Sequence, residues 1–261
     1  MITLYPFHTQ LQNAWKLFLS RWGSAVVIQL LLLIPAVFMY PFVNKYLAVV
    51  SSGLNPSAIF TASPEVTLFL FGFVTLILTG AFISAATGIL FAVKEKISLG
   101  KVIVSTLSTY IPMLYTSLLA GLAVIISLIP ALLLNYWYGV FALGGAPVTE
   151  SGLLAVDAIV LIAVVALLIP AAIVATWVMY APLAVALKAS PAGFTALMHT
   201  KHLVRHHVWQ LIWRMVGSMI LFQVVSASVS TLQYASYMVP FVLSIIIMAF
   251  FVEIYKELQE A

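Results

Sequence analysis

The sequence predicts an all-α membrane protein with six transmembrane helices, and two observations carry this prediction. Of the 261 residues, 64% are apolar and only 7% are charged, whereas about a quarter of the residues of a soluble domain are charged. Six segments also hold the roughly 20 mostly apolar residues that a helix needs to cross a hydrocarbon core of about 30 Å. We therefore expect a single integral membrane domain over residues 1–261. The expected spans are approximately 24–43, 67–93, 111–134, 159–187, 211–233 and 239–255.

The fourth expected span is unusually long and contains two prolines, Pro170 and Pro182. Proline removes one backbone hydrogen bond and its ring clashes with the preceding turn. We therefore expect a kink or an extension along the membrane surface here, and not one straight rod.

The basic residues predict the orientation of the chain. Ten of the eleven Lys and Arg residues lie before the first span, after the last span, or in or beside every second connection, with Arg214 in the first turn of the fifth span, while only Lys45 lies in the alternate set. The alternate connections carry Glu65 and Glu150 instead. Because Lys and Arg are enriched on the cytoplasmic side, both ends of the chain are expected in the cytoplasm. The ten residues are Lys16, Arg21, Lys94, Lys96, Lys101, Lys188, Lys201, Arg205, Arg214 and Lys256.

Three similar stretches predict an internal repeat. Each begins with a residue suited to cap a helix N-terminus: Thr9, which with Gln12 forms a Thr-x-x-Gln capping box, Ser98, and Ser190, which is followed by Pro191. Each continues as a mixed polar and apolar helix and then enters a span. The expected repeats cover approximately 9–97, 98–189 and 190–261.

The ends of the even-numbered spans support the same repeat. Phe-Ala-Val at 91–93 is followed by Lys96, Leu-Ala-Val at 183–185 is followed by Lys188, and Phe-Phe-Val at 250–252 resembles both. Two spans per repeat is an even number, so the three repeats would be parallel to one another about an axis along the membrane normal. Each would be introduced by an amphipathic helix at the cytoplasmic interface.

These interfacial helices allow two interpretations, which can both hold. Helices with Trp and Phe on one side and Lys or Arg on the other lie at the level of the lipid headgroups, and their basic side chains would then bind anionic lipid. Alternatively, each helix only positions the next span. The candidate headgroup ligands are Lys16, Arg21, Lys201, Arg205, His199, His202 and His206.

The histidines also have the spacing of a metal site, because His202 and His206 are four residues apart on one helix face. Lys201 and Arg205 lie beside them and would repel a cation, and no carboxylate is near in the sequence. A face directed at lipid headgroups is therefore the better interpretation, and we expect no metal and no cofactor.

Two carboxylates are candidates for a role in or beside the membrane. Asp157 lies near the outer start of the fourth span, where intramembrane acids are functional suspects, although a position at the outer interface fits it better. Glu253 lies near the cytoplasmic end of the sixth span, where a neighbouring lysine such as Lys94 is an expected partner. No nucleophile and base are paired, so we do not expect an enzyme.

Composition excludes further classes. Without cysteine the chain has no disulfide and no thiolate metal ligand. The first residues lack the basic and apolar regions of a removable signal peptide. No segment outside the expected spans is large and basic enough for nucleic acid, so the expected partners are membrane lipids, other membrane proteins or further copies of the chain.

The segment 163–213 resembles a known family. Its marks are Pro170 and Pro182 twelve residues apart, then Phe-Thr-Ala-Leu at 194–197 and Val-Trp at 208–209. These features resemble the YciC-type uncharacterised bacterial inner-membrane proteins and the related membrane domain of some glycerophosphoryl diester phosphodiesterases. The resemblance implies a six-helix protein of the bacterial inner membrane and brings no activity with it.

Taken together, these features predict a non-enzymatic integral membrane protein that supports envelope or lipid homeostasis, by lipid binding or as a subunit of a membrane assembly. The alternative is a small-molecule transporter or channel with a cavity between the repeats. A transporter needs polar residues along a path, and the sequence has few within its spans.

Overall fold

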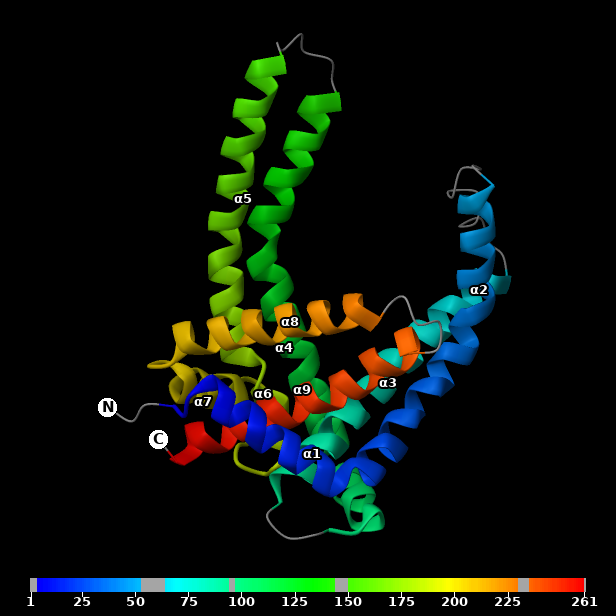
Figure 1. Ribbon diagram of the computed structural model, residues 1–261, viewed down its shortest axis with the longest axis vertical. Helices are drawn as coiled ribbons and strands as arrows, with labels where there is room; N and C mark the ends of the chain where they lie inside the picture. The colour runs from blue at the N-terminus through cyan, green and yellow to red at the C-terminus, as the bar shows by residue number, and fades with distance from the viewer. Residues whose placement is uncertain (1–3, 53–63, 94–96, 144–149, 230–234, 261) are drawn as a thin grey trace. The chain divides into compact units, whose positions relative to one another are not determined.

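The computed structural model describes residues 4–52, 64–93, 97–143, 150–229 and 235–260. Within these ranges it leaves the side chains at 50, 139–143, 150–158, 229, 235–238 and 240 undescribed. Every regular element in the described part of the chain is helical, which confirms the predicted all-α fold (Figure 1). The elements are α1 Phe7–Gln29, the 3-10 turn η1 Leu30–Leu32, α2 Leu33–Ser51, α3 Pro64–Ala92, α4 Leu99–Leu143, α5 Glu150–Val178, α6 Ala181–Ala186, α7 Phe194–Val204, α8 Val208–Val229 and α9 Ala235–Glu260.

Five stretches of the described residues are long and apolar enough to cross a membrane, so the chain has the helices of a multi-pass membrane protein. Each of the first five predicted spans lies within one of these stretches, apart from a few residues at its C-terminal end in some cases. The sixth, 239–255, lies in α9, which is helical as expected but is not among the five; a count of six stays a prediction. The five are Phe7–Val49, Pro64–Ala92, Leu99–Tyr138, Ile159–Ala186 and Val208–Ser228.

The chain divides into two compact units, one of Met1–Leu114 with Phe222–Ala261 and one of Tyr115–Leu221. In the first unit α2 packs along α3, while α1 packs against both α3 and α9. In the second unit the short helix α7 packs against α5 and α6.

The first unit brings the two ends of the chain together (Figure 1). The backbone N–H of Tyr5 donates to the Glu257 carboxylate over 3.3 Å, and Gln10 Nε2 donates to the same oxygen over 2.6 Å. The rings of Phe7 and Phe250 meet edge to face with their centroids 5.5 Å apart. The start of α1 therefore lies beside the end of α9.

These contacts correct the predicted start of the first helix. Thr9 does not cap it, because α1 begins at Phe7 with Pro6 in the cap position and without a side-chain cap. The hydroxyl of Thr9 lies 3.3 Å from the ring of His8 instead. Since Tyr5 and Phe7 are already fixed against α9, the backbone becomes helical before it reaches Thr9.

The other two predicted caps have different outcomes. Ser98 directly precedes α4, and its carbonyl accepts the first helical bond from the Val102 N–H over 3.1 Å, as predicted. Ser190 does not cap α7, which begins at Phe194 after Gly193. The reason is the backbone of Gly193, whose φ of 81° is open to glycine and strained for other residues.

The predicted break in the fourth span is confirmed. Helix α5 runs through Pro170 to Val178, and Pro182 lies in the first turn of the separate short helix α6, where its missing N–H costs no hydrogen bond. Helix α6 ends in a Schellman motif: Ala189 N–H donates to the Ala184 carbonyl and Lys188 N–H to that of Val185. Lys188 has a φ of 58°, a position usually held by glycine.

A break between the predicted interfacial helix and the following span is found in only one of the three predicted repeats. Residues 205–207 separate α7 from α8. Helix α4, in contrast, is continuous over 45 residues, or about 68 Å at 1.5 Å per residue. This is about twice the thickness of a hydrocarbon core, so the interfacial part and the span form one helix.

Close packing in the first unit yields a test. A Cβ on Gly72 of α3 would lie 2.6 Å from Met39 Cγ and 3.2 Å from its backbone nitrogen in α2. We expect Gly72→Ala to destabilise the protein by roughly 1–3 kcal/mol, the usual cost of overpacking. The measurement is the apparent unfolding temperature of the detergent-solubilised protein.

Gly80 in the same helix provides the matched control, because no described atom lies within 4 Å of its Cβ position. Gly80→Ala should be neutral or stabilising by up to about 1 kcal/mol, since alanine favours the helix. Equal losses in both variants would contradict close packing of α2 on α3 at Gly72.

Candidate functional site

Helix α1 presents three faces. The buried face consists of residues four apart that pack into the first unit: Gln10, Ala14 and Phe18. Phe18 is thus buried, whereas Trp15, Leu19 and Trp22 of the same helix are exposed. The two exposed faces adjoin each other, one with Trp15, Leu19 and Trp22, and one with Gln12, Lys16 and Ser20.

This arrangement suits the boundary between hydrocarbon and water. Trp15 is 48% and Trp22 58% exposed, although exposing a large aromatic side chain to water is unfavourable in free energy. Tryptophan is enriched at membrane interfaces because its ring has both an apolar body and a polar N–H. Lys16 lies beside these rings on the polar face and makes no hydrogen bond or ion pair with any residue that the structure describes.

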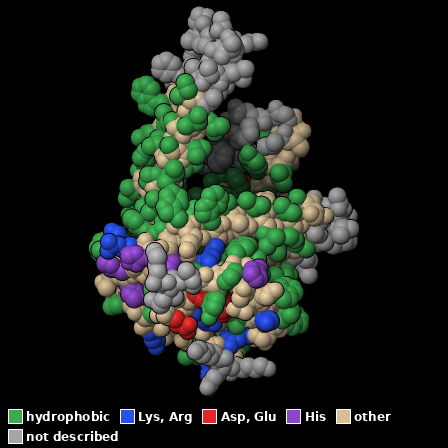
Figure 2. All heavy atoms as spheres, turned by 60° about the vertical axis from the view of Figure 1, so that its left-hand side comes forward, with side chains coloured by type: hydrophobic (Ala, Val, Ile, Leu, Met, Phe, Trp, Pro, Cys, Tyr) green, Lys and Arg blue, Asp and Glu red, His purple; other side chains and the backbone are tan. Residues whose placement is uncertain are grey.

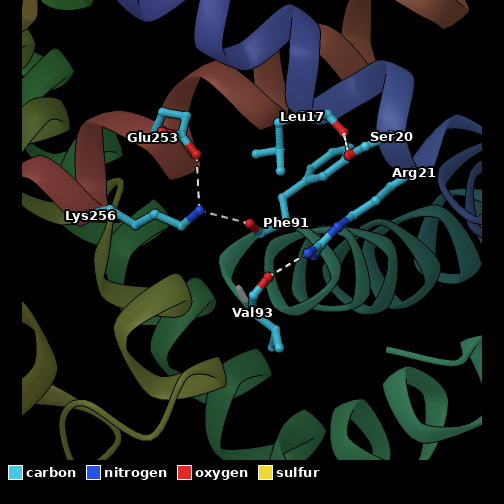
Figure 3. Close-up of polar contacts among 7 residues, drawn as sticks. All are labelled: Leu17, Ser20, Arg21, Phe91, Val93, Glu253 and Lys256. Atoms are coloured by element: carbon cyan, nitrogen blue, oxygen red, sulfur yellow. Dashed lines mark hydrogen bonds and ion pairs between the residues drawn. The ribbon is translucent and has the colours of Figure 1, made fainter. Parts of the chain in front are cut away.

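The guanidinium group of Arg21 contacts the C-terminal end of α3. Its Nη2 donates to the Val93 carbonyl over 2.6 Å, and Lys256 Nζ of α9 donates to the Phe91 carbonyl over 2.9 Å (Figure 3). Both carbonyls belong to the C-terminal end of α3, where helical acceptors lack intrahelical donors and the helix dipole favours cations. Arg21 therefore acts as a cap that joins α1 to α3, while its candidate role at a headgroup stays a prediction.

Glu253 also lies at this end of α3. Its carboxylate pairs with Lys256 over 2.9 Å, one turn along α9. The expected partner Lys94 lies outside the described residues, so the contact in the structure is with Lys256. The same lysine thus binds both the carboxylate and the Phe91 carbonyl (Figure 3), which connects α9 with α3.

The remaining basic and histidine candidates gather on α7 and the turn that follows it. Lys201, His202, Arg205 and His206 are exposed, and His199 is half-buried. On the face that Figure 2 shows, several histidine side chains lie together beside Lys or Arg. In the described part of the chain no three of His, Asp and Glu lie close enough to share a metal ion.

Two contacts fix α7 within the second unit. The ammonium group of Lys201 lies 4.9 Å from the centroid of the Trp177 ring of α5, a distance that gives a cation–π attraction. At the other end of α7, the Gly193 N–H donates to Thr116 Oγ1 over 2.8 Å. A Cβ on Gly193 would lie 2.8 Å from the ring of Tyr115, so this approach also requires glycine.

Asp157 lies in α5, and the structure does not describe its side chain. Its predicted role at the outer interface therefore stays a prediction.

Sequence patterns did not find the capping of α3 or the anchoring of Gly193. Both depend on contacts between residues distant in the sequence, such as Arg21 with Val93 and Gly193 with Thr116. The one available signal was an isolated glycine before a helix, which often marks a backbone conformation closed to other residues.

Comparison with protein-family models, curated proteins and solved structures finds no match. The function is therefore argued from the chain's own residues.

We expect substitution of the two cations of α1 to affect stability differently. Arg21→Gln removes a charged donor from a carbonyl at the end of α3, which typically costs about 1.5–3 kcal/mol, so the apparent unfolding temperature should fall. Lys16→Gln removes the same charge type from an exposed position on the same helix and should leave stability nearly unchanged. If both variants unfold like the wild type, Arg21 is not a structural cap.

Proposed function

We propose that the chain is a non-enzymatic integral membrane protein that binds membrane lipid through its interfacial helices and so supports envelope or lipid homeostasis. In this proposal it belongs to the group of YciC-type bacterial inner-membrane proteins that its sequence resembles. It crosses the membrane six times, as three parallel repeats of two spans each, with both ends in the cytoplasm.

The adjacency of the two chain ends supports the even number of spans. Tyr5 and Gln10 both donate to Glu257, so residues near the two termini share one polar site. A chain that crosses a membrane an odd number of times has its ends on opposite sides. Six spans keep this site on one side, and the basic residues favour the cytoplasm for it.

Similar burial of their first helices supports the three proposed repeats. The first helix of each proposed repeat buries residues at a spacing of four. These are Gln10 and Ala14 in α1, Val102 and Thr106 in α4, and Ala196 and Thr200 in α7. Two of these helices pack on the second span of another repeat. Helix α1 contacts α9 and α7 contacts α5 and α6.

Helix α4 contacts the second span of the first repeat, α3, through Tyr110. The Tyr110 hydroxyl donates to the Leu78 carbonyl of α3 over 2.9 Å, and its ring lies beside Phe82 with the centroids 5.9 Å apart. All three helices that introduce the proposed repeats thus contact the second span of another repeat, α1 and α7 by packing along it and α4 through Tyr110.

The lipid role is carried by one observation: exposed tryptophan lies next to exposed basic side chains on the interfacial helices. In α1 this pair is Trp15 and Lys16, which are neighbours in the sequence; beyond α7 both Arg205 and Trp209 are exposed, four residues apart in the sequence. Side chains of these two kinds together match an acyl region beside a charged headgroup layer.

The test is lipid retention after gentle extraction. We expect the triple variant Lys16→Gln, Lys201→Gln, Arg205→Gln to retain clearly less phospholipid than the wild type, measured by mass spectrometry of the intact protein. The matched control is Lys45→Gln, which removes a partly exposed lysine paired with Glu65 at 3.1 Å on the proposed outer side. Unchanged retention in the triple variant, or an equal loss in the control, would refute lipid binding by these faces.

A further inference from the structure

One stripe of α7 changes from apolar to cationic along its length. Phe194, Met198, Lys201 and Arg205 follow the spacing i, i+4, i+7 and i+11, which keeps residues on one face of an α-helix. Arg205 retains helical dihedral angles of −47° and −42°, so the spacing applies to the whole stripe. At 1.5 Å per residue the stripe is about 16 Å long.

The side chains of this stripe are exposed, although the Lys201 ammonium also lies over the Trp177 ring of the protein itself. Phe194 is 69% and Met198 38% exposed, and Lys201 and Arg205 are exposed as well. The opposite face of α7 is buried through Ala196, Thr200 and Val204, as expected of a helix that is packed on one side only.

The charge around the stripe has a single sign. Between Asp157 and Glu253 the sequence contains no Asp or Glu, so no acid from this long segment can neutralise Lys201 or Arg205. Within the described residues Arg205 makes no hydrogen bond or ion pair, while Lys201 makes only the cation–π contact with Trp177. Two cations therefore stand beside exposed apolar side chains without a counter-ion from their own segment.

From these observations we infer that α7 selects anionic phospholipid over zwitterionic phospholipid. The phosphate and the net negative charge of the headgroup lie at Lys201 and Arg205, and an acyl chain lies along Met198 and Phe194. This inference rests on the proposed lipid-binding function and deepens it by naming the lipid class and the helix that recognises it.

Helix α1 lacks this feature. Its exposed aromatic residues Trp15 and Trp22 lie beside one exposed cation, Lys16, because Arg21 is directed to the Val93 carbonyl. A single lysine adds about 1 kcal/mol near an anionic surface, so α1 serves as a general interfacial anchor while selectivity resides in α7.

A structural role for the same charges makes a different prediction. Cations in the last turn of a helix stabilise it through the helix dipole, and Lys201 and Arg205 are in or just after the last turn of α7. If stability is their only role, their loss should lower the unfolding temperature without altering lipid preference.

The experiment uses the full-length protein in nanodiscs of phosphatidylcholine with a minor fraction of phosphatidylglycerol. After gentle extraction the phosphatidylglycerol content of the retained lipid is compared with that of the bulk. We expect roughly ten- to thirtyfold enrichment in the wild type, from about 1 kcal/mol per cation for two cations. The double variant Lys201→Gln, Arg205→Gln should fall close to the bulk ratio.

Three matched variants separate charge from folding. The charge-conserving variant Lys201→Arg, Arg205→Lys and the single variant Lys16→Gln should keep the enrichment. The variant Phe194→Ala, Met198→Ala should retain less lipid in total, because it removes apolar contact.

Each contrary outcome has a distinct meaning. Enrichment that survives Lys201→Gln, Arg205→Gln, or that Lys16→Gln removes equally, would overturn the assignment to α7 while total lipid retention still supports lipid binding. Loss of the phosphatidylglycerol enrichment in excess inorganic phosphate, with total lipid retention unchanged, would show that the stripe recognises free phosphate and would overturn its selection of anionic lipid. Absence of retained lipid in the wild type would refute the proposed function itself.

Discussion

The C-terminal end of α3 is the point on which the first unit depends. Helices satisfy their own backbone inside hydrocarbon, but the last carbonyls of each helix need donors from elsewhere. In this protein Arg21 of α1 and Lys256 of α9 supply them, at Val93 and Phe91. The carbonyl groups at the end of α3 thus join α1, α3 and α9 by accepting these two hydrogen bonds. With so few charges in the chain, two of the eleven cations are committed to this end.

This commitment also sorts the cations by role. Those directed at carbonyls, such as Arg21, hold helices together, and those left exposed, such as Lys16 and Arg205, remain available to headgroups. The sorting follows from geometry and not from residue type, because Arg21 and Arg205 are chemically identical. It explains why charge variants on one helix are expected to separate into structural and lipid-binding classes.

The sequence predicted the helices well because apolar length and proline placement are local properties. Pro182 marked a break, and Ser98 marked the start of α4, from their own stereochemistry. Thr9 was predicted wrongly because contacts of Tyr5 and Phe7 with α9, which is distant in the sequence, fix the start of the helix before the capping box is reached. These failures have one cause: tertiary contacts override a local signal.

The candidate site shows the same division. Helical periodicity placed Lys16, Lys201 and Arg205 at positions that are exposed in the structure. It does not separate Phe18, which is buried, from Trp15, which is exposed, because periodicity orders residues around a helix without showing which side meets the core. It also could not distinguish Arg21 from Lys16, since only the fold brings a free carbonyl to one of them.

The central claim is that the chain crosses the membrane six times and returns its C-terminus to the side of its N-terminus. Because the protein contains no cysteine, a single Glu260→Cys substitution at the end of α9 provides a unique label site, with Ser52→Cys after α2 as the opposite-side reference. In bacterial spheroplasts exposed to a membrane-impermeant maleimide, six spans predict labelling of Ser52→Cys at once and of Glu260→Cys only after lysis. Labelling of both in intact spheroplasts would mean an odd number of spans and would contradict the account.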